Sequence, residues 1–335
     1  MNGKETIYFK NHPKILGAGS IVGKYESDGP LAEYFDKCIE DGRNGEDTWE
    51  QAESKFHNIA LGFALGKANL GMSDLQCILS GDLLNQCVAS SFAWRDMGVP
   101  FLGLYGACST FAEGLTIASM LVDSDHLDNA AVSVSSHFCT AERQYRNPLA
   151  YGSQRPPTAQ RTVTGAGSVI VAKGCEKHPQ TVCATLGAVV DSGINDANNM
   201  GAAMAPAAYE TLKKHFENTN AKPSDFDLIA TGDLGEVGRK ILIEFFSRDG
   251  VELGDNYIDC GCEMFDIHRQ DVHSGASGCA CLATVFSGYI MSGLLSKKWN
   301  RILIAGTGSL QSPLTIQQKE TIPGVCHAVE IISGE

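Results

Sequence analysis

The sequence lacks any block of basic residues. Its 335 residues include 26 Lys and Arg against 39 Asp and Glu, which gives a formal net charge of −13. A protein that binds the phosphate backbone of nucleic acids presents clustered positive charge to it. We therefore expect no nucleic-acid partner.

Segments typical of export or membrane insertion are also missing. Residues 1–5 form no apolar stretch of the kind found in a signal peptide, and the uncharged segment 279–295 is shorter than the roughly 20 residues that cross a bilayer. We expect the 12 cysteines to be reduced thiols in the cytosol, and residues 279–295 to form a buried helix.

The residues that are present predict a globular α/β protein. Apolar residues make up 43% of the chain, with no low-complexity tract. Short apolar runs at 77–79, 101–104 and 130–134 are typical of buried strands, and residues 107–122 of a helix. Strands alternating with a helix in this way favour a parallel sheet that is covered on both faces.

The second half of the chain repeats the first. Segment 224–234 matches segment 73–83 in its Ser, Asp, Ile, Gly, Asp and Leu residues at a constant offset of 224 − 73 = 151. The helix after Gly106 recurs after Gly278, and the strand predicted at 167–172 recurs at 326–332. We therefore predict an internal duplication with an N-terminal half, 1–175, and a C-terminal half, 176–335.

Cys108 stands where such a fold places its ligands. The turn Gly106-Ala107-Cys108-Ser109-Thr110 joins a predicted strand to the following helix, beyond the carboxyl end of the strand. A helix N-terminus favours a thiolate, so Cys108 is a candidate nucleophile or part of an anion site. The alternative is a small buried cysteine without a chemical role.

His137 and four arginines follow the next predicted strand. His137 ends that strand at the same edge of the sheet, where it is either functional or hydrogen-bonded to a carbonyl as a structural residue. Arg143, Arg146, Arg155 and Arg161 surround a Pro/Gly-rich stretch, and a guanidinium binds carboxylates with two donors. We favour Arg143 as a ligand anchor, because it follows His137 most closely.

Two further patterns predict no site. Single-residue spacing within the cysteine pairs is shorter than in structural zinc sites, so we expect no metal at Cys260, Cys262, His268, His273, Cys279 and Cys281. The string Gly306-Thr307-Gly308 lacks the third glycine of a dinucleotide-binding loop.

Several motifs, spread over nearly the whole chain, carry a family resemblance. They are Gly81-Asp82-Leu83-Leu84-Asn85-Gln86, Gly106-Ala107-Cys108-Ser109-Thr110, Ala141-Glu142-Arg143-Gln144, Met204-Ala205-Pro206-Ala207-Ala208, Thr231-Gly232-Asp233-Leu234, Gly275-Ala276-Ser277-Gly278-Cys279-Ala280-Cys281 and Gln317-Gln318-Lys319-Glu320. The chain resembles the thiolase and ketoacyl-synthase superfamily, and within it the stage V sporulation protein AD family of endospore formers. The resemblance implies the thiolase-like five-layer αβαβα fold, a homodimer and no resident cofactor.

The sequence departs from the condensing enzymes of that superfamily at their catalytic positions. Those enzymes pair the nucleophile with His and Asn or with two His, and the matching places here hold Asp233 and Ser274. Where thiolases carry a further acid/base cysteine, this sequence reads Ile304-Ala305-Gly306-Thr307. A cysteine without a base or an oxyanion donor loses orders of magnitude in rate, so we expect a binding protein rather than an enzyme.

For the sporulation family the resemblance implies binding of dipicolinic acid, alone or with Ca²⁺, and a part in its uptake into the developing spore. It implies a peripheral subunit on the cytoplasmic face of the inner forespore membrane, beside other channel proteins of the same operon. Asp82 and Asp233 are candidate oxygen ligands, or simply caps of the turns that follow them. The predicted ligand-binding residues are Asp82, Asn85, Cys108, Ser109, His137, Arg143, Asp233, Ser274 and Gly278. The alternatives are an acyltransferase with Cys108 as nucleophile, and a structural subunit with a vestigial pocket.

Overall fold

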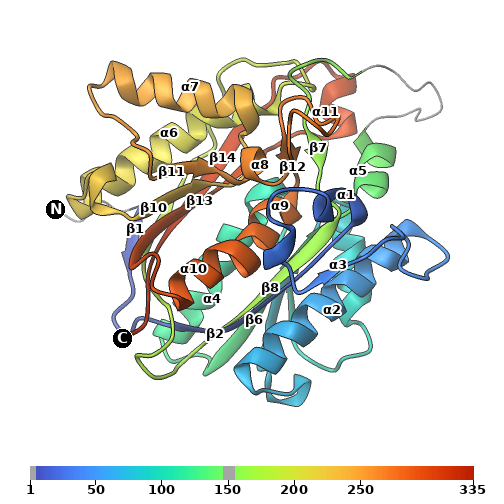
Figure 1. The fold of residues 1–335 in the computed structure, drawn as a ribbon, viewed down its shortest axis with the longest axis vertical. Coiled ribbons are helices and arrows are strands. Elements are labelled where there is room, and N and C mark those ends of the chain that lie inside the picture. Colours follow the sequence, from blue (N-terminus) through green and yellow to red (C-terminus); the bar gives the residue numbers. More distant parts are fainter. Residues whose placement is uncertain (1–4, 146–154) are drawn as a thin grey trace.

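Strand order is the feature that repeats most clearly. A computed structural model describes residues 5–145 and 155–335, so Arg146 lies outside the described residues (Figure 1). Within them, the first half forms the array β5-β4-β6-β8-β2 and the second half the array β11-β10-β13-β14-β9. The first array consists of β2 (Lys14–Val22), β4 (Ile78–Gly81), β5 (Phe101–Gly103), β6 (Asn129–Ser136) and β8 (Gly165–Ala172). The second consists of β9 (Gln180–Leu186), β10 (Leu228–Thr231), β11 (Tyr257–Asp259), β13 (Arg301–Ser309) and β14 (Gly324–Ile332).

The pairing directions repeat as well. β4 is parallel to β5 and β6, whereas β8 is antiparallel to β6 and β2, and the second array follows the same scheme. The arrays meet where Lys14 pairs with Gln180, and together with β1 (Thr6–Tyr8) and β3 (Lys37–Cys38) they form one 12-stranded sheet. The predicted division at residue 175 falls between β8 and β9, and stays a prediction as a domain boundary.

Helices complete five layers, and the α/β class and thiolase-like fold are confirmed (Figure 1). The central layer holds α4 (Thr110–Asp123), which packs on strands of both arrays, and α9 (Cys279–Val285), which packs on α4. A π-helical turn (Phe286–Ile290) joins α9 to α10 (Met291–Leu295). The outer layers hold α2 (Trp49–Ala68) and α3 (Val88–Trp94) on the first array, and α6 (Met200–Thr219) with α7 (Gly235–Arg248) on the second.

The duplication extends to the ends of the outer helices. Helices α2 and α6 have 20 residues each, and both end at an asparagine in the left-handed conformation, Asn69 and Asn220. These two residues are also 220 − 69 = 151 positions apart. Asparagine tolerates this conformation and stops a helix, so the same local signal ends both helices.

The remaining α-helices and strands are short, and β7 and β12 pair with each other in a separate two-stranded sheet. They are α1 (Lys24–Ser27), α5 (Phe138–Tyr145), β7 (Arg161–Thr162), α8 (Cys260–Glu263), β12 (Ala276–Ser277) and α11 (Pro313–Gln317). All residues of α9 are buried, as expected, but the predicted buried helix 279–295 is buried only in part, because Ser292 and Leu295 of α10 are exposed. None of the helices in the described residues is both long and apolar enough to span a membrane.

Candidate ligand site

Cys108 lies on a tight turn between β5 and α4. The turn is a 3₁₀-helix, Ala107–Ser109, and Ala107 takes the positive φ of 51° that few residues other than glycine adopt. The Thr110 hydroxyl donates to the Ala107 carbonyl at 2.6 Å, and the Ser109 hydroxyl to the Gly106 carbonyl at 2.7 Å. These bonds fix the turn and place the Cys108 thiol in the interior, where the residue is 7% exposed. Ser109 therefore shapes the turn.

Strand β13 of the second half packs directly against this turn. A Cβ atom on Gly308 would stand 2.7 Å from the Gly106 carbonyl oxygen, and one on Gly306 would stand 2.6 Å from the Ala112 Cβ. Both distances are shorter than real contacts, so only glycine permits the approach. The Gly306-Thr307-Gly308 string thus serves the contact between the two halves.

Asp233 joins the two halves at this place. Its Oδ1 accepts the Thr307 hydroxyl at 2.8 Å, and its Oδ2 accepts the Gly278 N–H at 2.9 Å. The Cys108 thiol also interacts with this carboxyl group. We call Cys108, Asp233, Gly278 and Thr307 the thiol–carboxyl cluster. It contains three of the nine predicted ligand-binding residues.

Burial determines the protonation of this cluster. It raises the pKa of Asp233 to about 7, against the opposing effect of the hydrogen bonds from Cys108, Gly278 and Thr307. Burial, followed by the charge of Asp233, holds the pKa of Cys108 well above its usual range. The position at a helix N-terminus is as predicted, but the expectation that it favours a thiolate is wrong, because desolvation and a neighbouring carboxylate both disfavour the anion.

Asp82 and Asn85 lie apart from this cluster. The Asp82 carboxylate accepts the Leu84 N–H at 2.8 Å and both the N–H and the hydroxyl of Ser90, at 2.8 and 2.6 Å. It therefore caps the following turn and helix α3, which was the structural alternative. Asn85 is exposed, and its N–H donates to Gln144 at 3.0 Å.

His137 and Ser274 also have structural partners. His137 Nε2 lies 2.8 Å from the Gly42 carbonyl, its Nδ1 accepts the Cys139 N–H at 3.1 Å, and its ring stacks on Phe56. Burial lowers the pKa of His137, so the ring is neutral at pH 7. Ser274 accepts the Val237 N–H at 3.3 Å in the first turn of α7. Neither residue has a recorded contact with Cys108.

Arg143 is already paired. Its guanidinium forms an ion pair with Glu50 and lies over the Trp49 ring, and its side chain is 52% exposed. It lines a surface pocket of about 320 Å³ together with Glu50, Leu84, Asn85, Val88, Thr140 and Gln144. The positive charge expected of Arg143 is therefore neutralised by Glu50 of α2. The prediction missed this partner, because it rested on the distance from His137 along the chain.

The two described arginines further along are better shielded. The Arg155 side chain is 13% exposed, and its Nη2 donates to the Asp271 carbonyl at 2.6 Å. The Arg161 guanidinium stands 3.9 and 3.8 Å from the ring centroids of Tyr25 and Phe138.

The cysteine pairs considered for zinc make other bonds. Cys279 donates its thiol hydrogen to the Ala107 carbonyl, with Sγ 3.0 Å from the oxygen, and Cys281 donates to the Gly232 carbonyl at 3.4 Å. Among residues 5–145 and 155–335, the pairs contribute to no group of three or more ligating atoms.

Sequence reasoning missed the importance of Asp259. This buried carboxylate accepts the N–H groups of Leu234 and Gly235, both at 2.9 Å, and thereby closes the turn that carries Asp233. The only available signal was its position after a short apolar segment in an acidic protein, which is not specific.

Comparison with known proteins identifies the family. The family model described as stage V sporulation protein AD matches residues 3–332. A curated relative of that name from Bacillus subtilis (strain 168) is 43% identical over 329 residues, which are 98% of this chain and 97% of the relative. This chain belongs to the stage V sporulation protein AD family. It accordingly has a role in sporulation.

Solved structures support the fold of this sporulation protein. Cerulenin-bound OleA of Xanthomonas campestris has a TM-score of 0.63 at 15% identity and covers 97% of this chain and 98% of its own. The 3-oxoacyl-[acyl-carrier-protein] synthase III of Aquifex aeolicus VF5 has a TM-score of 0.58 at 15% identity, with 96% and 99% covered. At such identities the likeness shows the thiolase-like fold alone.

Proposed function

We propose that this protein binds dipicolinate, free or as its calcium complex, at the thiol–carboxyl cluster, and so takes part in its uptake into the developing spore. Membership of the sporulation family supports the context. The observation that carries the proposal is the buried Asp233 carboxyl, which Gly278 and Thr307 hold in place and which interacts with Cys108. It puts a carboxyl group beside Cys108, at the position where condensing enzymes of this fold hold a nucleophile.

Acyl transfer fits this arrangement poorly. It needs a thiolate, a base that accepts the thiol proton, and free donors that stabilise an oxyanion. An ionised Asp233 repels a thiolate at Cys108, and the Gly278 N–H is already bonded to Asp233. The acyltransferase alternative is therefore disfavoured by both charge and hydrogen bonding.

The two protonation states of Asp233 suit the two forms of the ligand. Dipicolinate carries two carboxylates beside a pyridine nitrogen. Burial raises the pKa of Asp233 to about 7, so its protonated form is accessible near neutral pH and can donate a hydrogen bond to a ligand carboxylate. In its ionised form it offers the oxygen ligand that Ca²⁺ prefers.

The edge of the first array is the surface that we propose for the homodimer. Strand β5 is an edge strand, and its Phe101 and Leu102 are 36% and 46% exposed, with Tyr105 nearby at 51%. An edge strand with exposed apolar side chains is covered in most proteins, here by pairing with β5 of a second copy. We further propose a peripheral position on the inner forespore membrane, beside the channel proteins of the same operon.

Calorimetry with dipicolinate, with and without Ca²⁺, tests the proposed ligand and its location. We expect saturable binding by the wild type, at least tenfold weaker binding by Asp233→Ala, and unchanged binding by Arg143→Ala. The Arg143 variant is the control, because it alters the surface pocket and leaves the cluster intact. Absence of binding would overturn the proposal, and a loss confined to Arg143→Ala would place the ligand in the surface pocket instead.

A second assay tests the enzyme alternative directly. The protein is incubated with acyl-CoA, and thiol release and intact mass are followed. We expect no covalent adduct, because the Cys108 thiol keeps its proton. An acyl adduct that disappears in Cys108→Ala, with thiol release at an enzymatic rate, would establish the transferase.

A further inference from the structure

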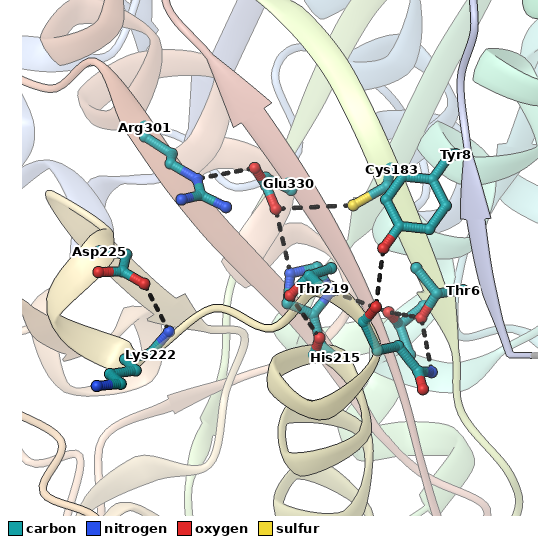
Figure 2. Close-up of polar contacts among 11 residues, drawn as sticks. Thr6, Tyr8, Cys183, His215, Thr219, Lys222, Asp225, Arg301 and Glu330 are labelled. Carbon is teal, nitrogen blue, oxygen red and sulfur yellow. Dashed lines mark hydrogen bonds and ion pairs between the residues drawn. The ribbon is translucent and has the colours of Figure 1, made fainter. Parts of the chain in front are cut away.

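Three ligating side chains meet on the outer side of the second array, away from the thiol–carboxyl cluster. Cys183 comes from β9, His215 from α6 and Glu330 from β14, and they are 1%, 0% and 4% exposed (Figure 2). One ligand atom from each residue lies within 4.8 Å of the other two. We call them the Cys–His–Glu trio.

Distances within the trio fit a tetrahedral metal ion. Glu330 Oε2 lies 3.7 Å from Cys183 Sγ and 3.4 Å from His215 Nε2. Zinc bonds of about 2.3 Å to sulfur and about 2.0 Å to nitrogen and oxygen place tetrahedral ligands roughly 3.5 Å (S to O) and 3.3 Å (N to O) apart. The two distances to Glu330 therefore fit a tetrahedral ion to within a few tenths of an ångström, and the sulfur and Nε2 lie within 4.8 Å of each other.

The His215 ring is oriented as in metal sites. Its Nδ1 lies 2.9 Å from the Thr185 hydroxyl, which lies 2.9 Å from the Thr6 hydroxyl. Its Nε2 is fully buried and has no hydrogen-bond partner among the described residues. A polar outer contact on one nitrogen fixes the ring and leaves the lone pair of the other for a metal.

Glu330 divides its two oxygens between Arg301 and the trio. Its Oε1 accepts the Arg301 Nε–H at 2.8 Å, and its Oε2 faces Cys183 and His215 (Figure 2). The Arg301 contact fixes the carboxyl group with Oε2 directed at the sulfur and the imidazole. A carboxylate oxygen and, once deprotonated, a thiol sulfur supply the negative charge that a dication needs.

The first half shows that the fold does not require polar residues here. The offset of 151 residues relates His215 to Ala64. In the strand pairing, Ile170 takes the place of Glu330. Gly17, which pairs with Ile170, takes the place of Cys183, which pairs with Glu330. Ala64 and Ile170 are fully buried in an apolar cluster, and a Cβ on Gly17 would stand 2.2 Å from the Ala64 carbonyl oxygen. The same place is closed by apolar packing in one half and by three ligating groups in the other.

We propose that Cys183, His215 and Glu330 bind a divalent transition-metal ion of the zinc type, which fastens helix α6 to strands β9 and β14. A thiolate and an imidazole select such ions over Ca²⁺, so this site is distinct from any calcium that accompanies the ligand. On binding, the Cys183 thiol transfers its proton to solvent and the sulfur bonds to the metal. The proposal does not depend on dipicolinate binding.

Titration of chelator-treated full-length protein with Co²⁺ and Zn²⁺ tests this site. We expect one equivalent of Co²⁺ to give the thiolate charge-transfer band and the visible bands of a tetrahedral ion, and one equivalent of Zn²⁺ to abolish them. Zn²⁺ should also raise the melting temperature. Cys183→Ser should remove the charge-transfer band and weaken binding at least tenfold.

Cys326→Ser is the matched control. Cys326 is buried like Cys183, but it lies on β14 and outside the trio. It should bind Co²⁺ like the wild type. Circular dichroism of both variants without metal checks that they fold, and His215→Gln gives a second variant should Cys183→Ser fail to fold. Absence of stoichiometric binding by the wild type, or a charge-transfer band that persists in Cys183→Ser, would overturn the proposal.

Discussion

Asp82 and Asp233 follow equivalent strands in the two halves, yet their carboxyl groups accept hydrogen bonds from different places. Asp82 closes its own turn by accepting the N–H groups of Leu84 and Ser90. In the second half, Asp259 on β11 accepts the turn N–H groups instead. The pairing register relates Asp259 to Gly103, which has no side chain to offer. One carboxylate on the neighbouring strand thus frees Asp233 to face Cys108.

The largest effect is expected where this difference is broken. Asp259→Ala removes the acceptor of two turn N–H groups, the Cys262 N–H and the Thr231 hydroxyl. Buried donors without partners cost about 1–3 kcal/mol each, so the free energy of unfolding should fall by about 3 kcal/mol or more. Urea denaturation measures this, and Asp82→Ala should show a loss of similar kind. Wild-type stability in Asp259→Ala would contradict the comparison.

Gly278 and Gly106 precede equivalent helices and provide a second comparison. Gly278 has a φ of 102°, and an added Cβ would stand 2.8 Å from the Ser136 hydroxyl, whereas Gly106 has a φ of −93°. Gly278→Ala should therefore lower the free energy of unfolding by about 1–3 kcal/mol through backbone strain. Gly106→Ala should cost less, because its clash is with the end of the Glu113 side chain. If Gly106→Ala melted at a lower temperature than Gly278→Ala, the backbone conformation would not determine the loss of stability.

Glu53 and Met204 occupy the same position in α2 and α6, 204 − 53 = 151 residues apart. Burial, with the nearby Asp82 carboxyl, raises the pKa of Glu53. Its contribution to stability is therefore fully present below the ordinary carboxyl pKa and is lost as the pH rises through the raised value. Between pH 6.5 and 8.5 the wild type should lose on the order of 1 kcal/mol that Glu53→Met keeps. Urea denaturation at several pH values measures the free energy of unfolding. If that free energy changed equally with pH in the wild type and in Glu53→Met, the prediction would be wrong.

The fold was predictable because its signals are local and occur twice. The segments around β4 and β10 share Ser, Asp, Ile, Gly, Asp and Leu at equivalent positions, and helices α2 and α6 both end at an asparagine, Asn69 and Asn220. Asp233 was found through its match with Asp82. Its surroundings were not, since Thr307 binds Asp233 from β13 and Asp259 holds the turn after Asp233 from β11, across the sheet rather than along the chain.

The remaining errors have the same origin. Arg143 was preferred for its closeness to His137 in sequence, but its partner Glu50 comes from a different helix. Cys183, His215 and Glu330 belong to three separate elements and form no motif, so only the folded chain brings them together.

The pH dependence of dipicolinate binding tests the central claim most directly, because the claim places at the ligand a carboxyl, Asp233, whose pKa burial raises to about 7. Dipicolinate stays a dianion between pH 6 and pH 8, while Asp233 loses its proton in this range. Calorimetry without calcium should therefore show binding several-fold tighter at pH 6 than at pH 8 for the wild type, and the same affinity at both values for Asp233→Asn. Wild-type binding that does not change with pH, or an equal change in Asp233→Asn, would contradict the account.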